Sequence, residues 1–269
     1  MALSLHYSFS RAALEAAVLG GRYANIRTFQ YGGMSVNTTT FHADGPKYAT
    51  LDGAASWYNL THAAAISSPP ICHPWGCHPQ LNPFEQFSAT CTYFGVGMAD
   101  LGKDTPIGLV QSSVGGMQIE AYLDNETLTT CMNESGYKWN ASVPTQNIGY
   151  PITSKLYYGM VTPFVNMSLA GWAWYQGENN CHGDMGNSAT KIGYGCDQVA
   201  LVALWRRVWA ASSATAPLAP FGIVNLASGG SEGAGDHMAH MRWSQTGNMG
   251  ALPNAVMPAT FLAQAFDIG

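Results

Sequence analysis

Short apolar segments alternate along the chain with segments that carry apolar residues every three or four positions. The short segments predict β-strands at residues 23–30, 106–112, 169–175, 221–226 and 259–268. The others predict helices at residues 11–19, 84–101, 197–209 and 239–249. Strands alternating with helices are typical of an α/β domain with a mainly parallel sheet, whose functional residues gather at the carboxyl ends of the strands.

Two of the predicted helices have an apolar face. In the first, the face consists of Phe87, Cys91, Phe94, Met98 and Leu101. In the second, it consists of Leu201, Leu204, Trp205 and Val208. Residues at this spacing lie on one side of a helix, so we expect both faces to pack against the sheet.

Two intervals, 45–83 and 124–151, are rich in turn-forming residues and are predicted to be loop insertions in a single domain spanning residues 1–269. The second interval carries three Asn-x-Ser/Thr sequons and predicts a glycosylated loop. With 269 residues, one domain with a sizeable core is expected.

The low charge of the chain excludes several functions. Only 10% of the residues are charged, against about 25% in an average soluble protein, and the net charge is −5. The chain therefore offers no basic surface for nucleic acid. No apolar run reaches the ~18 residues of a membrane span. We expect no nucleic-acid partner, no membrane span, no cofactor and no metal.

Sequons and cysteines point to an oxidising compartment. Six of the fifteen Asn residues begin a sequon, where roughly two are expected from the share of Ser and Thr. These are Asn37, Asn59, Asn125, Asn133, Asn140 and Asn166. Six cysteines permit three disulfides in fifteen possible pairings. We expect a secreted or lysosomal protein, although the first residues lack the basic and apolar regions of a signal peptide.

A pair of glycines follows the strand predicted at 106–112. Gly115 and Gly116 stand where that strand turns toward the next helical segment. Glycines at such a turn expose backbone N–H groups that can stabilise an oxyanion. The alternative is a plain tight turn with no catalytic role.

A polar cluster follows the strand predicted at 169–175. Gln176 is a candidate amide donor to an oxyanion, and Glu178 is a candidate for orienting its neighbours. Asn179 and Asn180 are candidate substrate-binding residues. The alternative is a polar cap on the following helix, a position that Asn and Glu both favour.

A buried Glu178 needs a cation, and Arg242 is the best candidate in a chain with so few charges. Glu120 is a second carboxylate that competes for it. We therefore expect an Arg242–carboxylate contact, and we include Arg242 among the candidate substrate-binding residues.

Three segments together resemble the sialate O-acetylesterase family, of the SGNH-hydrolase type. Members carry S-S-W-G-G-T-x-I-E-A-W, W-Y-Q-G-E-S-N and I-R-x-x-Q. The corresponding segments here are SSVGGMQIEAY at 112–122, WYQGENN at 174–180 and MRWSQ at 241–245. The similarity extends, with gaps, from about Tyr23 to the last residue. The departures, which put the identity of the substrate in doubt, are Val114, Met117, Tyr122 and Asn179.

The resemblance implies a flavodoxin-like three-layer α/β/α fold and a serine carboxylic-ester hydrolase that removes acetyl groups from sugar hydroxyls. The implied substrate is an O-acetylated sugar or sialoglycan. The family nucleophile lies in G-Q-S-N-M and its base in a C-terminal D-x-x-H, and neither motif occurs here. Met1 aligns with the Met of the first motif, so we expect a chain truncated at both ends, without the first strand, the signal peptide or the C-terminal catalytic segment, and inactive by itself.

Two other interpretations stay open. A triad within the chain would have to use Ser112, Ser113, His237 or His240. A non-catalytic secreted carbohydrate-binding protein, a pseudoenzyme, would use some of the eight Trp and thirteen Tyr residues as sugar platforms.

The segment CHPWGCH at 72–78 brings two Cys and two His close together in the sequence. We interpret it as a disulfide-pinned surface loop rather than a metal site.

Overall fold

A computed structural model describes most of the chain, in two compact units. The described residues are 11–32, 57–66, 71–73, 76–78, 82–102, 105–114, 117–135, 154, 156–181, 193–227 and 236–264. The first unit, called the N-terminal unit below, comprises Ala2–Val36 and Thr50–Val114. The C-terminal unit comprises Gly115–Gly269 together with Met1 and Asn37–Ala49.

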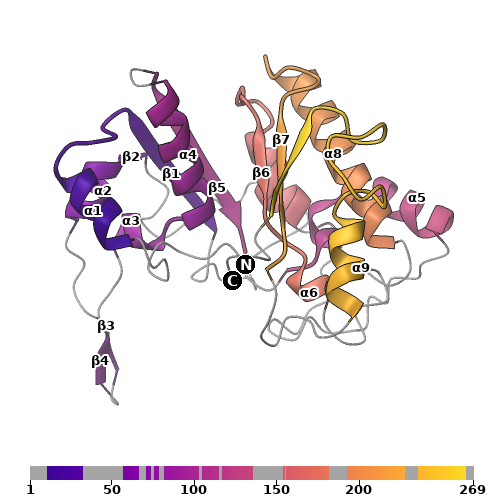
Figure 1. Ribbon diagram of the computed structural model, residues 1–269, viewed down its shortest axis with the longest axis horizontal. Coiled ribbons are helices and arrows are strands. Elements are labelled where there is room, and N and C mark those ends of the chain that lie inside the picture. Colours follow the sequence, from indigo (N-terminus) through magenta and orange to yellow (C-terminus); the bar gives the residue numbers. More distant parts are fainter. Residues whose placement is uncertain are drawn as a thin grey trace. The chain divides into compact units, whose positions relative to one another are not determined.

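The N-terminal unit contains a mixed three-stranded sheet in the order β2-β1-β5. β1 (Ile26–Gly32) and β5 (Ile107–Ser113) run parallel, with Ile26 opposite Ile107, while β2 (Tyr58–Asn59) is antiparallel to β1. Figure 1 shows these strands with their helices, which are α1 (Arg11–Leu19), α2 (Leu60–Ala65), α3 (Pro83–Gln86) and α4 (Ala89–Leu101).

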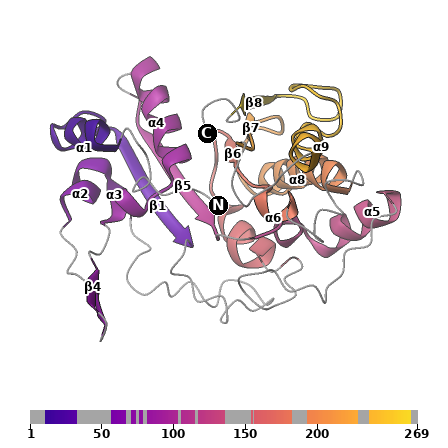
Figure 2. The same ribbon diagram turned by 60° about the horizontal axis from the view of Figure 1, so that its bottom comes forward.

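The helix α4 lies along β1 and β5 (Figure 2). Its buried residues are small ones, Thr92, Gly95 and Ala99. A Cβ added to Gly95 would come within 2.7 Å of Leu109 Cδ1, so the absence of a side chain permits this close approach. The predicted apolar face is wrong in part, because Phe87 is buried and Cys91 packs against the core but its last three residues are exposed. The side chains of Phe94, Met98 and Leu101 are 46%, 46% and 86% exposed. The helical segment predicted at 84–101 is also divided into α3 and α4, because Ser88 caps the second helix.

Part of the interval 45–83, predicted to be a loop insertion, belongs to the core. Leu60 and Ala63 of α2 are fully buried with Ile26 and Phe84. The Oδ1 of Asn59 caps α2 by accepting a hydrogen bond from the His62 backbone N–H at 2.7 Å. Further along, β3 (Ile71–His73) and β4 (Gly76–His78) form a hairpin whose backbone register places Cys72 opposite Cys77. The disulfide expected there stays a prediction.

The C-terminal unit contains a parallel sheet in the order β6-β7-β8. Its strands are β6 (Trp172–Trp174), β7 (Phe221–Asn225) and β8 (Thr260–Gln264), close to the predicted positions. Its α-helices are α5 (Asn125–Ser135), α6 (Glu178–Cys181), α8 (Gly193–Ser212) and α9 (Asp236–Ser244). Short helical turns occur at Ile119–Tyr122 (η3), Tyr157–Val161 (η4) and Thr162–Phe164 (η5).

The helix α8 is fixed to this sheet by aromatic rings and by one buried arginine. Trp205 packs edge-on against Trp174 with ring centroids 5.5 Å apart, and Trp209 does the same against Trp172. Arg206 donates hydrogen bonds of 2.7–3.1 Å to the backbone carbonyls of Ala219, Pro258 and Ala259. The predicted helix is confirmed, and its apolar face largely so, because Leu201, Leu204 and Trp205 are buried and Val208 is half-buried.

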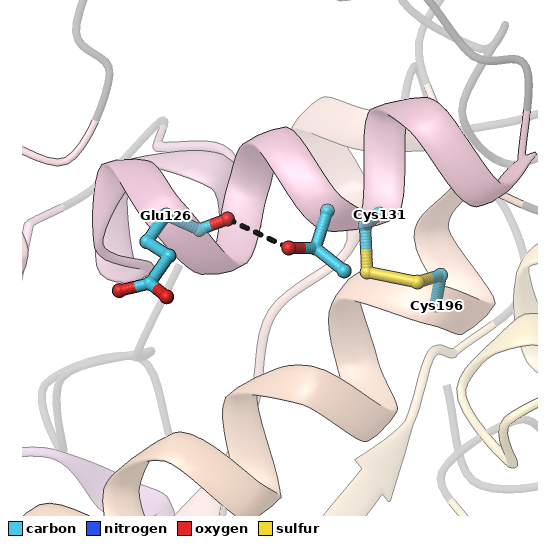
Figure 3. Close-up of a disulfide and its surroundings, with 4 residues drawn as sticks. Glu126, Cys131 and Cys196 are labelled. Atoms are coloured by element: carbon cyan, nitrogen blue, oxygen red, sulfur yellow. Dashed lines mark hydrogen bonds between the residues drawn. A yellow bond between two sulfur atoms is a disulfide. The ribbon is translucent and has the colours of Figure 1, made fainter.

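Where a glycosylated loop was predicted at 124–151, residues Asn125–Ser135 form the helix α5. The disulfide Cys131–Cys196 joins α5 to α8, with Cα atoms 5.7 Å apart (Figure 3). A helix forms here because Asp124 caps its first turn through the Thr127 N–H at 2.7 Å. Within the described residues, none of the helices combines the length and the apolarity needed to cross a bilayer.

Candidate functional site

The strand β6 ends in a turn that only glycine permits. Gly177 has φ +141°, in the region that L side chains rarely adopt. An added Cβ would also lie 3.1 Å from Leu226 Cδ1 and 3.3 Å from Met241 Sδ. This turn leads from the buried strand directly into α6, and it places Gln176 and Asn180 on its two sides.

The side chain of Gln176 joins three segments of the C-terminal unit. Its Nε2 donates to the Met117 carbonyl at 3.1 Å and to Asn180 Oδ1 at 2.6 Å. Its Oε1 accepts a hydrogen bond from the Tyr194 hydroxyl at 2.9 Å. Both amide hydrogens are thus directed at protein acceptors, so donation to an oxyanion would replace one of these bonds.

The side chain of Asn180 is fully buried and continues the network. Its Oδ1 accepts hydrogen bonds from Gln176 Nε2 and, at 3.1 Å, from the Ile119 backbone N–H. Its Nδ2 donates to Glu120 Oε2 at 2.8 Å. Asn180 was predicted to bind substrate, but its described contacts are to the protein's own groups.

Gln245 holds the other side of the turn. It is fully buried, and its Nε2 donates to the carbonyls of Gln176 at 3.0 Å and Val224 at 3.1 Å. Its Oε1 accepts hydrogen bonds from Asn225 Nδ2 and the Leu226 N–H. One side chain therefore bridges the end of β6, the end of β7 and the helix α9.

Two carboxyl groups are buried behind this network. Glu120 is 1% exposed and Asp197 is fully buried. Among the described residues, neither carboxyl oxygen of Asp197 has a hydrogen-bond partner. Burial, and next the charge of Glu120, raise the pKa of Asp197 well above its ordinary value. Burial likewise raises the pKa of Tyr194 well above its ordinary value. Asp197 therefore keeps its proton where an exposed Asp has lost it.

The other predicted site residues that the structure describes lie in two helices, α6 and α9. Glu178 and Asn179 are half-buried in α6, the short helix after the turn. Arg242 is half-buried in α9, where its Nε donates to the Leu226 carbonyl at 2.9 Å. Its predicted contact with a carboxylate stays a prediction.

Gly115 and Gly116 lie outside the described residues. The first described residue after them is Met117, whose carbonyl accepts the hydrogen bond from Gln176. Met117 therefore contacts the loop that follows β6, whereas a place for Gly115 beside Gln176 stays a prediction.

The candidate residues for a triad within the chain belong to different units. Ser112 and Ser113 end β5 in the N-terminal unit, whereas His237 and His240 lie in α9 of the C-terminal unit. A triad formed by these residues stays a prediction.

Sequence reasoning did not single out Tyr194, Asp197 or Gln198. The available signal was their spacing of three and four residues, which puts three polar side chains on one side of a helix otherwise rich in buried apolar residues. All three are fully buried. The Tyr194 hydroxyl also contacts Gln198 Oε1 at 3.3 Å.

Comparison with solved structures identifies the fold. A carbohydrate acetylesterase from Xanthomonas citri matches with a TM-score of 0.65 and 24% sequence identity, covering 100% of this chain and 48% of that chain. The mixed and parallel sheets described above are thus those of an α/β fold found in a carbohydrate acetylesterase. No protein-family model matches the chain.

Comparison with curated proteins gives the family. Sialate O-acetylesterases from Pongo abelii and Homo sapiens are 38% and 37% identical over 189 residues, which is 69% of this chain. The enzyme from Rattus norvegicus is 33% identical over 212 residues. The chain belongs to the sialate O-acetylesterase family. It spans about a third of the length of these relatives, 34–38%.

Proposed function

We propose that this protein is a carbohydrate O-acetylesterase of the sialate O-acetylesterase type, with a flavodoxin-like SGNH-hydrolase fold. Its substrate is an O-acetylated sugar or sialoglycan. The observation that supports this most directly is the meeting of two loops. The segment after Gly115 and Gly116 is tied to Gln176, and both loops carry the family motifs.

The proposed reaction is acyl transfer to a serine. The Ser Oγ attacks the acetyl carbonyl carbon while a His takes its proton, and the carbonyl oxygen becomes an oxyanion. The C–O bond to the sugar then breaks, and the sugar oxygen receives the proton. Water releases acetate from the serine in the second half of the reaction, with the His again acting as base.

In this proposal the chain supplies the side of the site that receives the oxyanion. Backbone N–H groups at Gly115 and Gly116 are the donors, and Gln176 donates directly or holds their loop in place. One such donor is worth about 3 kcal/mol, or roughly 10²–10³ in rate. The nucleophile and base motifs of the family, G-Q-S-N-M and D-x-x-H, do not occur in these 269 residues.

We also propose a secreted or lysosomal location. Four of the six sequons begin in described segments, at Asn59, Asn125, Asn133 and Asn166. The side chains of Asn59, Asn125 and Asn166 are exposed. The disulfide Cys131–Cys196 is compatible with an oxidising compartment.

The alternative is a non-catalytic carbohydrate-binding protein. It is favoured by the two hydrogen bonds that already occupy the Gln176 amide.

The test measures acetate release from O-acetylated sialic acid by the protein expressed from its complete coding sequence. The same preparation is assayed for binding to the intact glycan. Acetate release that stops when an upstream serine is replaced supports the esterase. Glycan binding without acetate release favours the binding protein and contradicts the proposal.

A further inference from the structure

We propose that Asn180 and Glu120 are positioning residues of this site. Asn180, anchored by the Glu120 carboxylate, fixes both the Gln176 amide and the backbone of the segment that follows Gly115 and Gly116. This inference rests on the proposed esterase function, which it deepens by naming the residues that hold the oxyanion side of the site in place.

The buried carboxamide of Asn180 contacts two loops and the Glu120 carboxylate at the same time. Its carboxamide has an acceptor directed at two donors from different loops, the Ile119 N–H at 3.1 Å and Gln176 Nε2 at 2.6 Å. Its donor end meets Glu120 Oε2 at 2.8 Å. The side chain is fully buried and so does not reach a substrate in solution. Its described contacts instead orient the groups that we propose to face the substrate.

A smaller or apolar side chain at position 180 cannot accept hydrogen bonds from both Ile119 and Gln176. Loss of the Asn180 oxygen leaves the buried Ile119 N–H without this acceptor, which is unfavourable in the protein interior. It also frees one hydrogen of the Gln176 amide, which can then rotate away from the Met117 carbonyl. A loop that shifts by about 1 Å can lower turnover by about 10²-fold.

A negative charge on Glu120 strengthens its hydrogen bond with Asn180. A hydrogen bond from an amide to a carboxylate is stronger than one to a neutral acid. Asp197 lies near enough for Glu120 to raise its pKa, and two buried carboxyls so placed do not both ionise. Glu120 accepts a hydrogen bond from Asn180, whereas neither carboxyl oxygen of Asp197 has a described donor, so a negative charge is the better stabilised on Glu120.

The hydrogen bond between Asn180 and Glu120 is therefore sensitive to pH. The titratable groups with an electrostatic influence on this cluster are Glu120 of η3, Tyr194 and Asp197 of α8, and Glu178 of α6. When Asp197 loses its proton, a second negative charge appears beside Glu120 and repels it. We therefore expect Asn180 to hold the loops best below the pH at which Asp197 ionises.

The first test measures amide hydrogen exchange at Ile119, a readout that needs no activity. Asn180→Ala should lower the Ile119 protection factor at least tenfold. Glu120→Gln, which keeps an oxygen acceptor for Asn180 Nδ2, should lower it less than Glu120→Ala does. Thr260→Val is the matched control. It removes a buried hydroxyl bonded to the Met257 carbonyl at 2.7 Å and should leave Ile119 protected.

The second test measures acetate release by the same variants in the complete protein. Asn180→Ala should lower kcat about 10²-fold with KM within about twofold of wild type. Asp197→Asn should weaken any decline of Ile119 protection as the pH rises, because it removes the group that ionises.

Three outcomes would overturn the inference. In the first, Ile119 stays protected in Asn180→Ala, or loses protection equally in Thr260→Val. In the second, Ile119 loses protection while kcat stays at the wild-type value; the proposed function then survives and only the positioning role falls. In the third, the wild-type protein releases no acetate, which refutes the esterase itself.

Discussion

The amide nitrogen of Gln176 lies 3.1 Å from the backbone carbonyl of Met117, and this hydrogen bond joins two loops that are 59 residues apart in the sequence. The bond is buried, and Asn180 and Tyr194 hold the two ends of the same amide. An exposed amide at this position would exchange its partners with water. A buried one fixes both loops together, which a preorganised site requires.

Gly177→Ala is expected to lower the free energy of unfolding of the C-terminal unit by about 1–3 kcal/mol. The positive φ and the contacts of the new Cβ with Leu226 and Met241 both act against the substitution. Urea unfolding followed by tryptophan fluorescence measures the change.

The matched control is Gly97→Ala in α4. No atom lies within 4 Å of the added Cβ, and alanine favours a helix by about 1 kcal/mol over glycine. We expect this variant to be as stable as wild type or more so. Equal destabilisation by the two substitutions would contradict the role of Gly177.

Arg206→Lys is expected to cost about 2–4 kcal/mol of unfolding free energy. A lysine has one donor group and cannot reach the carbonyls of Ala219, Pro258 and Ala259 together, so buried acceptors lose their partners. Arg207→Lys is the control, because the neighbouring side chain is 68% exposed and its contact with Asp124 is 4.0 Å long. It should change the stability by less than about 0.5 kcal/mol. Thermal denaturation should show a lower melting temperature for Arg206→Lys and a melting temperature near that of the wild type for Arg207→Lys.

Cys196→Ser is expected to destabilise the C-terminal unit by about 4 kcal/mol. The disulfide closes a loop of 65 residues, and opening it returns that conformational entropy to the unfolded chain. Addition of a reductant should lower the melting temperature of the wild type to near that of the variant. A melting temperature unaffected by both treatments would show that the disulfide does not form.

Asp197→Asn is expected to change how stability depends on pH. Because burial and Glu120 raise the pKa of Asp197 in the folded state, its contribution is fully present below the ordinary Asp value of about 4 and is lost as pH rises above it. The wild type should therefore lose unfolding free energy relative to Asp197→Asn as pH rises from about 4 toward neutrality. Urea unfolding at several pH values measures this, and parallel curves for the two proteins would contradict it.

The strands were predictable because their apolar runs are short and are bounded by turn residues. The strands β5 and β6 lie at or within one residue of the segments predicted at 106–112 and 169–175. The apolar face predicted for α4 was wrong at Phe94, Met98 and Leu101, because helix packing depends on shape as well as on hydrophobicity. Gly95 allows Leu109 to approach, so the small side of the helix is buried.

The buried polar network was not predictable from single residues. Nothing in the sequence around Asp197 and Tyr194 indicates that their polar side chains are buried. Their burial is a consequence of the tertiary fold. The helix α5 was missed because its residues favour turns when considered one by one. Its cap at Asp124 and its disulfide to α8 stabilise a helix that propensity alone does not predict.

The central claim is that Gln176 holds the oxyanion side of an acetylesterase site. The most direct measurement is the kcat for acetate release from an O-acetylated sugar by the complete protein, in wild type, Gln176→Ala and the exposed control Gln264→Ala. We predict that Gln176→Ala loses about 10²–10³ in kcat while Gln264→Ala keeps the wild-type value. A kcat for Gln176→Ala equal to that of the wild type would contradict the account.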